Sequence, residues 1–241
     1  MRTFMKGVKF PQAASKNCSS KDWDIMAEVN LLRSLPSTRR SIAARASAKT
    51  EDHVRISRQY GVEYFDGPRE YGYGGYSYDG RWVPVATDII EHFGLNPGDR
   101  VLDVGCAKGF LVKDLVDQGM DAFGIDVSDY ALMNCMPEVV GRLHLGSADN
   151  LPFPSGSFGA VVAINSIHNL PRDLCGHALA EIERLAPSRG FVQVDSYHTI
   201  DQKASFQEWV LTAEYHGFPS DWRALFDEVG YTGDWNWTIV E

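Results

Sequence analysis

The fold of this chain is decided by residues 101–115, which have the sequence VLDVGCAKGFLVKDL. An apolar run includes an acid, Asp103, and small residues then follow at alternate positions, Gly105, Ala107 and Gly109. An amphipathic segment comes next, so the pattern predicts a strand, a tight turn and a helix. Because the turn lacks bulky side chains, an adenosine-bearing ligand can lie directly against its backbone and the helix N-terminus. The stretch therefore predicts a nucleotide-binding turn.

Around this turn, apolar runs alternate with segments of helical periodicity. Strands are predicted at 100–104, 122–126, 142–145, 158–165 and 190–195, and helices at 84–93, 110–118, 130–135 and 172–185. This alternation predicts the α/β class: a doubly wound, mostly parallel sheet with its ligand at the carboxyl ends of the strands. Residues 95–241 are expected to form this domain.

The composition excludes several function classes. The chain has 241 residues, a net charge of -9 and a pI near 5.2, which argues against a nucleic-acid partner and favours a small-molecule substrate. No apolar run reaches the roughly 18 residues that a membrane span requires, so we expect a cytoplasmic protein without a membrane partner. The four cysteines lie far apart without a C-x-x-C pair, so no metal site and no disulfide framework is predicted. The oligomeric state is left open.

The N-terminal region, residues 21–94, is expected to form helices and an aromatic lid, after a mobile tail at 1–20. Apolar residues at three-residue intervals predict one helix from Asp22 to Leu35, and a second is expected from Ser37 to Tyr60.

Residues 64–82, YFDGPREYGYGGYSYDGRW, form a Tyr–Gly segment. Glycines at this density disfavour a stable helix, and the tyrosines are too many for an ordinary solvated loop. Two interpretations stay open: a loop whose rings pack on the domain surface, or a lid over the ligand. Ring faces attract a cation by roughly 0.5–2 kcal/mol each, so a lid of Tyr71, Tyr73 and Tyr76 would suit a cationic ligand. Arg69 and Arg81 would add a carboxylate clamp.

The motif DVGCAKG at 103–109 resembles the first motif of class I S-adenosylmethionine-dependent methyltransferases, with Ala107 in place of the usual middle glycine. Its spacing differs from the G-x-G-x-x-G of dinucleotide-binding proteins. Three further stretches match the family in register, over roughly residues 83–230. Asp126 ends the second strand, just before Val127, and an acid there accepts the ribose hydroxyls. SADNLPF at 147–153 resembles the adenine-contacting turn, and 156–165 resembles the turn and fourth strand beneath the methionine moiety.

The resemblance implies S-adenosylmethionine as cofactor, with a defined set of binding residues. These are Asp103, Gly105, Ala107, Gly109, Asp126, Val127, Ala148, Asp149 and Asn165, to which the lid adds Arg69 and Tyr71. LFDEVGY at 225–231 resembles the helix that enters the family's sixth strand. The chain departs from the pattern after it, because residues 232–241 leave nothing for the usual seventh, antiparallel strand. We therefore expect a shortened sheet or an edge that is built differently.

Three functions remain open at this point. The resemblance implies methyl transfer to a small-molecule acceptor, with His168, Asn165, Tyr73 and Tyr76 as catalytic candidates. His168 is either a base or a packed, helix-capping residue. A second hypothesis is cyclisation of S-adenosylmethionine itself, with release of methylthioadenosine, because the segment 71–82 resembles the azetidine-2-carboxylate synthases. A third is a non-catalytic, cofactor-binding regulatory subunit.

Overall fold

The core of the protein is one six-stranded parallel sheet with the strand order β3-β2-β1-β4-β5-β6. This computed structural model describes residues 26–35 and 49–240. The strands are β1 (Arg100–Val104), β2 (Asp121–Asp126), β3 (Leu143–Leu145), β4 (Ala160–Ile164), β5 (Gly190–Ser196) and β6 (Asp234–Ile239). The order reverses between β1 and β4, so the carboxyl ends of these two strands flank the place where such sheets bind their ligands.

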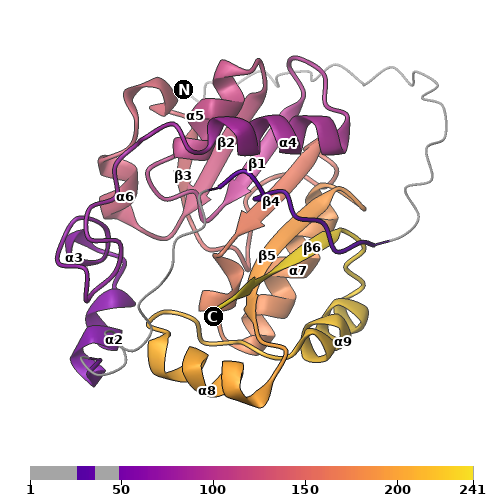
Figure 1. Cartoon of the computed structure of the whole chain (residues 1–241). Helices are drawn as coiled ribbons and strands as arrows, with labels where there is room; N and C mark the ends of the chain where they lie inside the picture. The colour runs from indigo at the N-terminus through magenta and orange to yellow at the C-terminus, as the bar shows by residue number, and fades with distance from the viewer. Residues whose placement is uncertain (1–25, 36–48, 241) are drawn as a thin grey trace, which may run out of the picture.

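Helices cover both faces of the sheet (Figure 1). They are α2 (Glu51–Ser57), α3 (Val62–Phe65), α4 (Val83–Phe93), α5 (Phe110–Asp117), α6 (Asp129–Met133), α7 (Arg172–Leu185), α8 (Ile200–Trp209) and α9 (Pro219–Val229), with short 3-10 helices η1 (Pro137–Val139) and η2 (Ile167–Asn169). One buried cluster joins the sheet to α7 and α9 through Leu179 and Phe226, and another joins it to α4 and α5 through Ile89 and Leu115. The predicted doubly wound α/β fold is confirmed.

The predicted elements from β1 to α7 agree with the structure to within about two residues at most ends. The limits of β1 and α7 match, and α4 begins at Val83, one residue before the prediction. The helix α8 was not predicted, although its Phe206 is fully buried.

The predicted helix from Asp22 to Leu35 is wrong over its described part. Residues 26–29 are extended instead, and Glu28 forms a parallel bridge with Trp235 of β6. The backbone N–H of Val29 donates to the carbonyl of Trp235 at 2.8 Å, and the N–H of Trp235 donates to Ala27. An edge strand leaves backbone groups that need partners, and the N-terminal segment supplies them. Residues 22–25 lie outside the described residues.

The prediction for Ser37 to Tyr60 is corrected at its end. The described part holds α2, which starts after a capping box formed by Thr50 and His53 and ends at Ser57. Tyr60 has a φ of 49°, which ends helical geometry. The tail at 1–20 and residues 36–48 lie outside the described residues.

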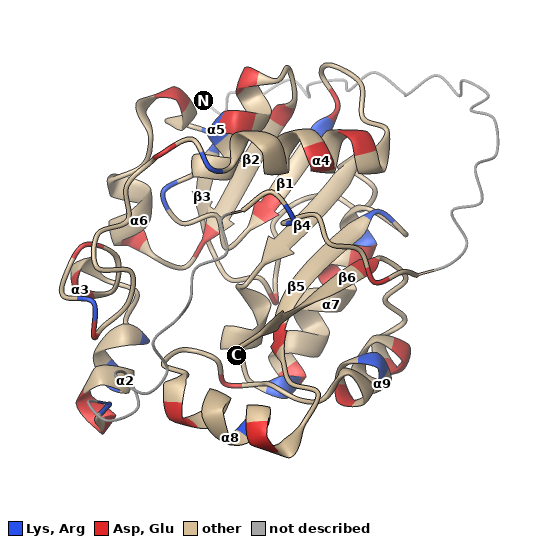
Figure 2. Cartoon of the chain, viewed as in Figure 1, with Lys and Arg blue, Asp and Glu red and all other residues tan. Residues whose placement is uncertain are grey.

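The expected departure at the C-terminal edge is also present. β6 pairs directly with β5 and runs parallel to it, so the sheet formed by the described residues contains no antiparallel strand. Acidic side chains are spread over the outer helices, among them α4, α8 and α9 (Figure 2), in keeping with the net charge of -9. Within the described ranges, no helix has the length and apolarity to span a membrane.

Candidate cofactor and acceptor site

The turn between β1 and α5 has the left-handed backbone that its small residues predict. Gly105 has a φ of 83°, and a Cβ there would lie 2.2 Å from the Cβ of Ser166, just after β4. The Ser166 hydroxyl also donates to the carbonyl of Val104 at 2.6 Å. Ala107 adopts a φ of 49°, a conformation that costs a non-glycine residue about 1–2 kcal/mol. The turn is therefore a fixed and strained platform.

Asp126, at the end of β2, holds this platform in place. One carboxylate oxygen accepts the N–H of Ala107 at 2.8 Å, and the other accepts the N–H of Ser128 at 2.8 Å. Burial raises the pKa of Asp126, and these backbone hydrogen bonds oppose the rise. Each oxygen keeps a second lone pair for a ligand.

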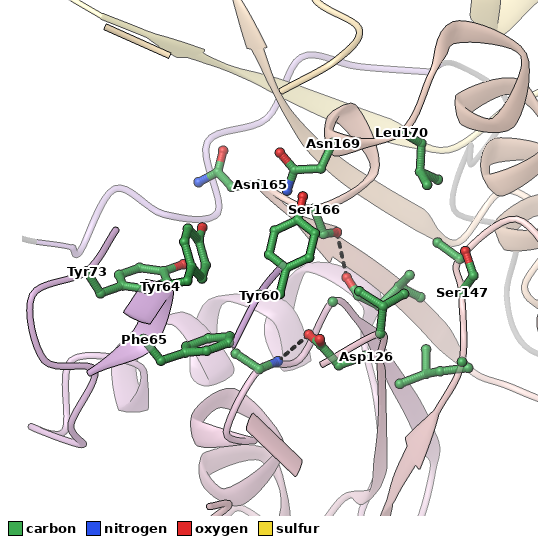
Figure 3. Close-up of a pocket in the computed structure, with 17 residues that line it drawn as sticks. Tyr60, Tyr64, Phe65, Tyr73, Asp126, Ser147, Asn165, Ser166, Asn169 and Leu170 are labelled. Atoms are coloured by element: carbon green, nitrogen blue, oxygen red, sulfur yellow. Dashed lines mark hydrogen bonds between the residues drawn. The ribbon is translucent and has the colours of Figure 1, made fainter. Parts of the chain in front are cut away.

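A first cavity, of about 690 Å³ with the open solvent at its mouth included, lies above this turn, and Figure 3 shows the side chains that line it. Its floor includes Gly105, Ala107 and Asp126, and its far side is formed by loops after β3 and β4. Aromatic rings from the N-terminal region close the remaining side. These rings belong to Tyr60, Tyr64, Phe65 and Tyr73.

Two more cavities adjoin the first one. The second, of about 780 Å³, extends toward α8 and includes His168 and Asp195 in its lining. The third, of about 1590 Å³, lies under the Tyr–Gly segment and includes Asp103, Tyr76 and Phe110. Tyr73 and Asn165 line all three cavities, so the cavities meet at these two side chains.

Asn165 is held at this junction in a strained conformation. Its φ is 53°, and its side-chain oxygen accepts the hydroxyl of Thr238 from β6 at 2.6 Å. The amide of Gln193 in turn donates to the Thr238 hydroxyl at 3.0 Å. Because the oxygen of Asn165 is engaged, its NH₂ group is the part of the amide that remains to donate to a ligand.

His168 lies in η2 with only 3% of its surface exposed. Its Nδ1 accepts the backbone N–H of Asp195 at 3.1 Å, and its Nε2 lies 3.3 Å from the Asp195 carboxylate. Burial lowers the pKa of His168 despite this carboxylate, so the ring is neutral with its proton on Nε2. Both ring nitrogens therefore have partners, and the histidine orients Asp195.

The Tyr–Gly segment is clamped to the turn through one buried lysine. Lys108 Nζ lies 2.7 and 2.8 Å from the two carboxylate oxygens of Asp66 and donates to the carbonyl of Tyr76 at 2.9 Å. Tyr130 of α6 also donates to Asp66 at 2.7 Å. Although burial opposes it, hydrogen bonds from Lys108 and Tyr130 lower the pKa of Asp66. The aromatic wall is thus tied to the backbone that carries Gly105 and Ala107.

The structure brings most predicted site residues to the three cavities. Gly105, Ala107, Asp126, Val127, Ala148, Asn165 and Tyr73 line the first cavity, His168 the second, Asp103 and Tyr76 the third, and Arg69 the second and third. Three lie outside these linings: Gly109 is the N-cap of α5, the Asp149 carboxylate accepts the Ser147 hydroxyl, and Tyr71 packs edge-on against His53.

Sequence reasoning missed lining residues from three places. They are Tyr60 with Tyr64 and Phe65 at the start of the Tyr–Gly segment, Ser166, Asn169 and Leu170 after β4, and 209–212 with Thr238 near the C-terminus. The position of 166–170 directly after the fourth strand was the signal that could have found the second group. Within the described part of the chain, no group of three or more His, Cys, Asp or Glu residues could hold a metal ion.

Comparison with known proteins agrees with this geometry. Residues 102–194 match the family model described as a methyltransferase domain. The chain is 25% identical over 155 residues to an uncharacterized methyltransferase of Synechocystis sp.. The aligned region covers 59% of this chain and 71% of that protein. It is 29% identical over 131 residues to a demethylmenaquinone methyltransferase of Symbiobacterium thermophilum, covering 48% of this chain and 50% of that protein.

A solved structure shares the fold. It is phosphoethanolamine N-methyltransferase 2 of Haemonchus contortus in complex with phosphomonomethylethanolamine and S-adenosylhomocysteine, with a TM-score of 0.53 and 18% identity over 72% of this chain and 44% of that one. This chain therefore spans about half the length of two of the three relatives named here. Residues 102–194 thus match a methyltransferase domain within a sheet of the same fold as a methyltransferase, and this match supports S-adenosylmethionine as the methyl donor.

Proposed function

We propose that the chain transfers the methyl group of S-adenosylmethionine to a small-molecule acceptor bound in the second cavity. The observation that carries this proposal is the meeting of the first and second cavities at Asn165 and Tyr73. Methyl transfer needs the nucleophile in line with the methyl–sulfur bond and shielded from water. Two adjoining cavities with a shared aromatic and amide wall supply that arrangement.

The adenosine part is assigned to the first cavity. There the carboxylate of Asp126 accepts the ribose hydroxyls with its remaining lone pairs, and residues 146–148 lie beside the adenine. The methionyl part extends toward the third cavity, where Asp103 is 5% exposed. Burial and the nearby Asp126 raise the pKa of Asp103 to about 7, which an ammonium group placed beside it would reverse.

The reaction forms one bond and breaks one. The acceptor's lone pair attacks the methyl carbon, the carbon–sulfur bond breaks, and its electron pair stays on sulfur to give S-adenosylhomocysteine. Tyr73 and Tyr64 cover the junction, where ring faces favour the cationic sulfonium and exclude water. Asn165 donates its NH₂ group to the acceptor or to the methionyl chain.

The second cavity also separates this proposal from the two alternatives. Cyclisation consumes S-adenosylmethionine alone, and a regulatory subunit needs only the cofactor, so neither needs a further polar chamber. A chamber of about 780 Å³ that contains the buried His168–Asp195 pair favours an acceptor.

The test is to incubate the purified full-length chain with S-adenosylmethionine, with and without pools of small alcohols, amines and carboxylates, and to identify products by mass spectrometry. We expect S-adenosylhomocysteine and a product heavier by one methyl group only when an acceptor is present. Methylthioadenosine formed without acceptor would instead establish cyclisation. Cofactor binding by calorimetry without either product would establish a binding subunit.

A further inference from the structure

Asp195 is a buried acid at the carboxyl end of β5 that the reaction scheme above does not use. It is 6% exposed and lines the second cavity. Its backbone is fixed on both sides, because its N–H donates to His168 and its carbonyl accepts the indole N–H of Trp222 at 3.0 Å. One carboxylate oxygen faces Nε2 of His168 at 3.3 Å, and the described residues give the other oxygen no hydrogen-bond partner.

Asp195 has a neutral histidine, not a cation, as its nearest side-chain partner. His168 is neutral because its Nδ1 accepts a backbone N–H, so it brings no positive charge to the carboxylate that lies 3.3 Å from its Nε2. Among the residues that the structure describes, no lysine or arginine forms an ion pair with Asp195. A buried carboxylate without a cationic partner is costly, and a cationic ligand removes that cost.

The walls of the second cavity suit the same kind of ligand. The rings of Tyr64, Tyr73 and Trp209 line it, and ring faces attract ammonium groups more strongly than hydroxyl groups. Arg69 also lines the cavity and its charge opposes a cationic ligand, although its guanidinium is engaged with the carbonyl of Tyr73.

From this geometry, and resting on the proposed function, we infer that the second cavity selects an acceptor with an amino group, which Asp195 binds as the ammonium ion. In the reaction, the ammonium gives one proton to the Asp195 carboxylate, and the nitrogen lone pair attacks the methyl carbon. The carbon–sulfur electron pair stays on sulfur, so the products are the methylated ammonium and S-adenosylhomocysteine. The protonated Asp195 returns its proton to water when the product leaves.

Two isosteric probes test the inference by calorimetry on the full chain saturated with S-adenosylhomocysteine. Benzylamine and benzyl alcohol have the same ring and differ in the group that meets Asp195. We expect wild-type protein to bind benzylamine at least about tenfold more tightly. Asp195→Asn keeps the shape and removes the charge, so it should abolish this preference. Asp227→Asn, on the exposed face of α9, is the matched control and should keep it.

Several results would overturn the inference. They are equal affinity of the two probes for wild-type protein, no benzylamine binding at roughly 10 mM, or an unchanged preference in Asp195→Asn. If Asp195→Asn does not fold, the relative affinity of wild-type protein for benzylamine and benzyl alcohol still tests the inference. Methylation of pooled alcohols but not of amines would refute this inference and leave the proposed function standing. Cofactor binding without methylation of any acceptor would refute the proposed function itself.

Discussion

Replacement of Asp103 by asparagine should stabilise the protein at alkaline pH. Asp103 is buried one residue before the end of β1, beside the turn, and the described residues offer it no hydrogen-bonding side chain. Burial and the charge of Asp126 raise its pKa to about 7, against 3.8 for a free carboxyl. The folded protein therefore holds a proton that the unfolded chain loses near pH 4, so stability falls as the pH rises from about 4 to about 7.

The size of the effect follows from the same shift. One pKa unit corresponds to about 1.4 kcal/mol, so full ionisation of Asp103 costs up to ~4 kcal/mol above pH 7. Asparagine mimics the neutral acid and pays none of this cost. Between pH 5 and pH 8, the advantage of Asp103→Asn over wild-type protein should grow by roughly 3 kcal/mol, since the shift spans about two units of that range.

Urea unfolding gives the free energy of unfolding of both proteins at pH 5 and at pH 8. The change between the two pH values in the difference between variant and wild type excludes any effect of the substitution that does not depend on pH. Asp149→Asn serves as the control, because that carboxylate lies outside the three cavities and is not buried. A stability difference that stays constant with pH would show that Asp103 is ionised throughout, and the assignment of an ammonium partner to it would lose its basis. In that assignment, Asp103→Asn also weakens S-adenosylmethionine binding at pH 8, measured by calorimetry.

Three more substitutions test separate parts of the site. Asp126→Ala removes the acceptor for the Ala107 and Ser128 N–H groups and for the ribose hydroxyls. The affinity for S-adenosylmethionine, measured by calorimetry, should therefore fall at least about tenfold. An unchanged affinity would refute the ribose assignment. Lys108→Met breaks the clamp on Asp66 and should speed cofactor release in stopped-flow fluorescence, whereas an unchanged rate would mean that the aromatic wall does not gate the site. Thr238→Val removes the hydroxyl that fixes the Asn165 amide, so turnover should fall roughly tenfold while the affinity for the cofactor stays the same. Thr238→Ser keeps the hydroxyl and should have the turnover of wild-type protein. Equal turnover in the two variants would contradict a role for the fixed Asn165 amide.

The sequence predicted those parts of the site whose geometry is local. Small residues at 105–109 and the acid at the end of β2 could be recognised because a tight turn needs them within a few residues of a strand end. The ends of β1 and α7 could also be predicted, since each element is a continuous hydrophobic pattern that turn-forming residues bound. Asp126 was identified because its strand ends beside the turn that it holds.

The sequence could not predict contacts between distant segments. Residues 26–35 carry apolar side chains at three-residue intervals, a spacing that favours a helix. In an extended segment the same spacing points side chains to opposite faces, and here Met26 packs against one core cluster and Val29 against the other. The choice between a helix and an extended segment depends on the open edge of β6, about 200 residues later, which pairs with Ala27 and Val29. The assignment of Asp149 to the adenine-contacting turn stays a prediction, and in this structure its carboxylate accepts the hydroxyl of Ser147, two residues before it.

The unusual edge of the sheet explains why its last strand contributes to the junction of the cavities. β6 runs parallel beside β5, and its residue Thr238 is in register with Asp195. The carboxyl ends of both strands therefore lie at the edge of the sheet that carries Asn165. In an antiparallel neighbour the carboxyl end would lie at the opposite edge, so a residue near the end of that strand, as Thr238 is in β6, would lie far from Asn165. Because Asn165 is a non-glycine residue in a left-handed conformation, the bond from Thr238 helps to offset its strain and fixes the direction of its NH₂ group.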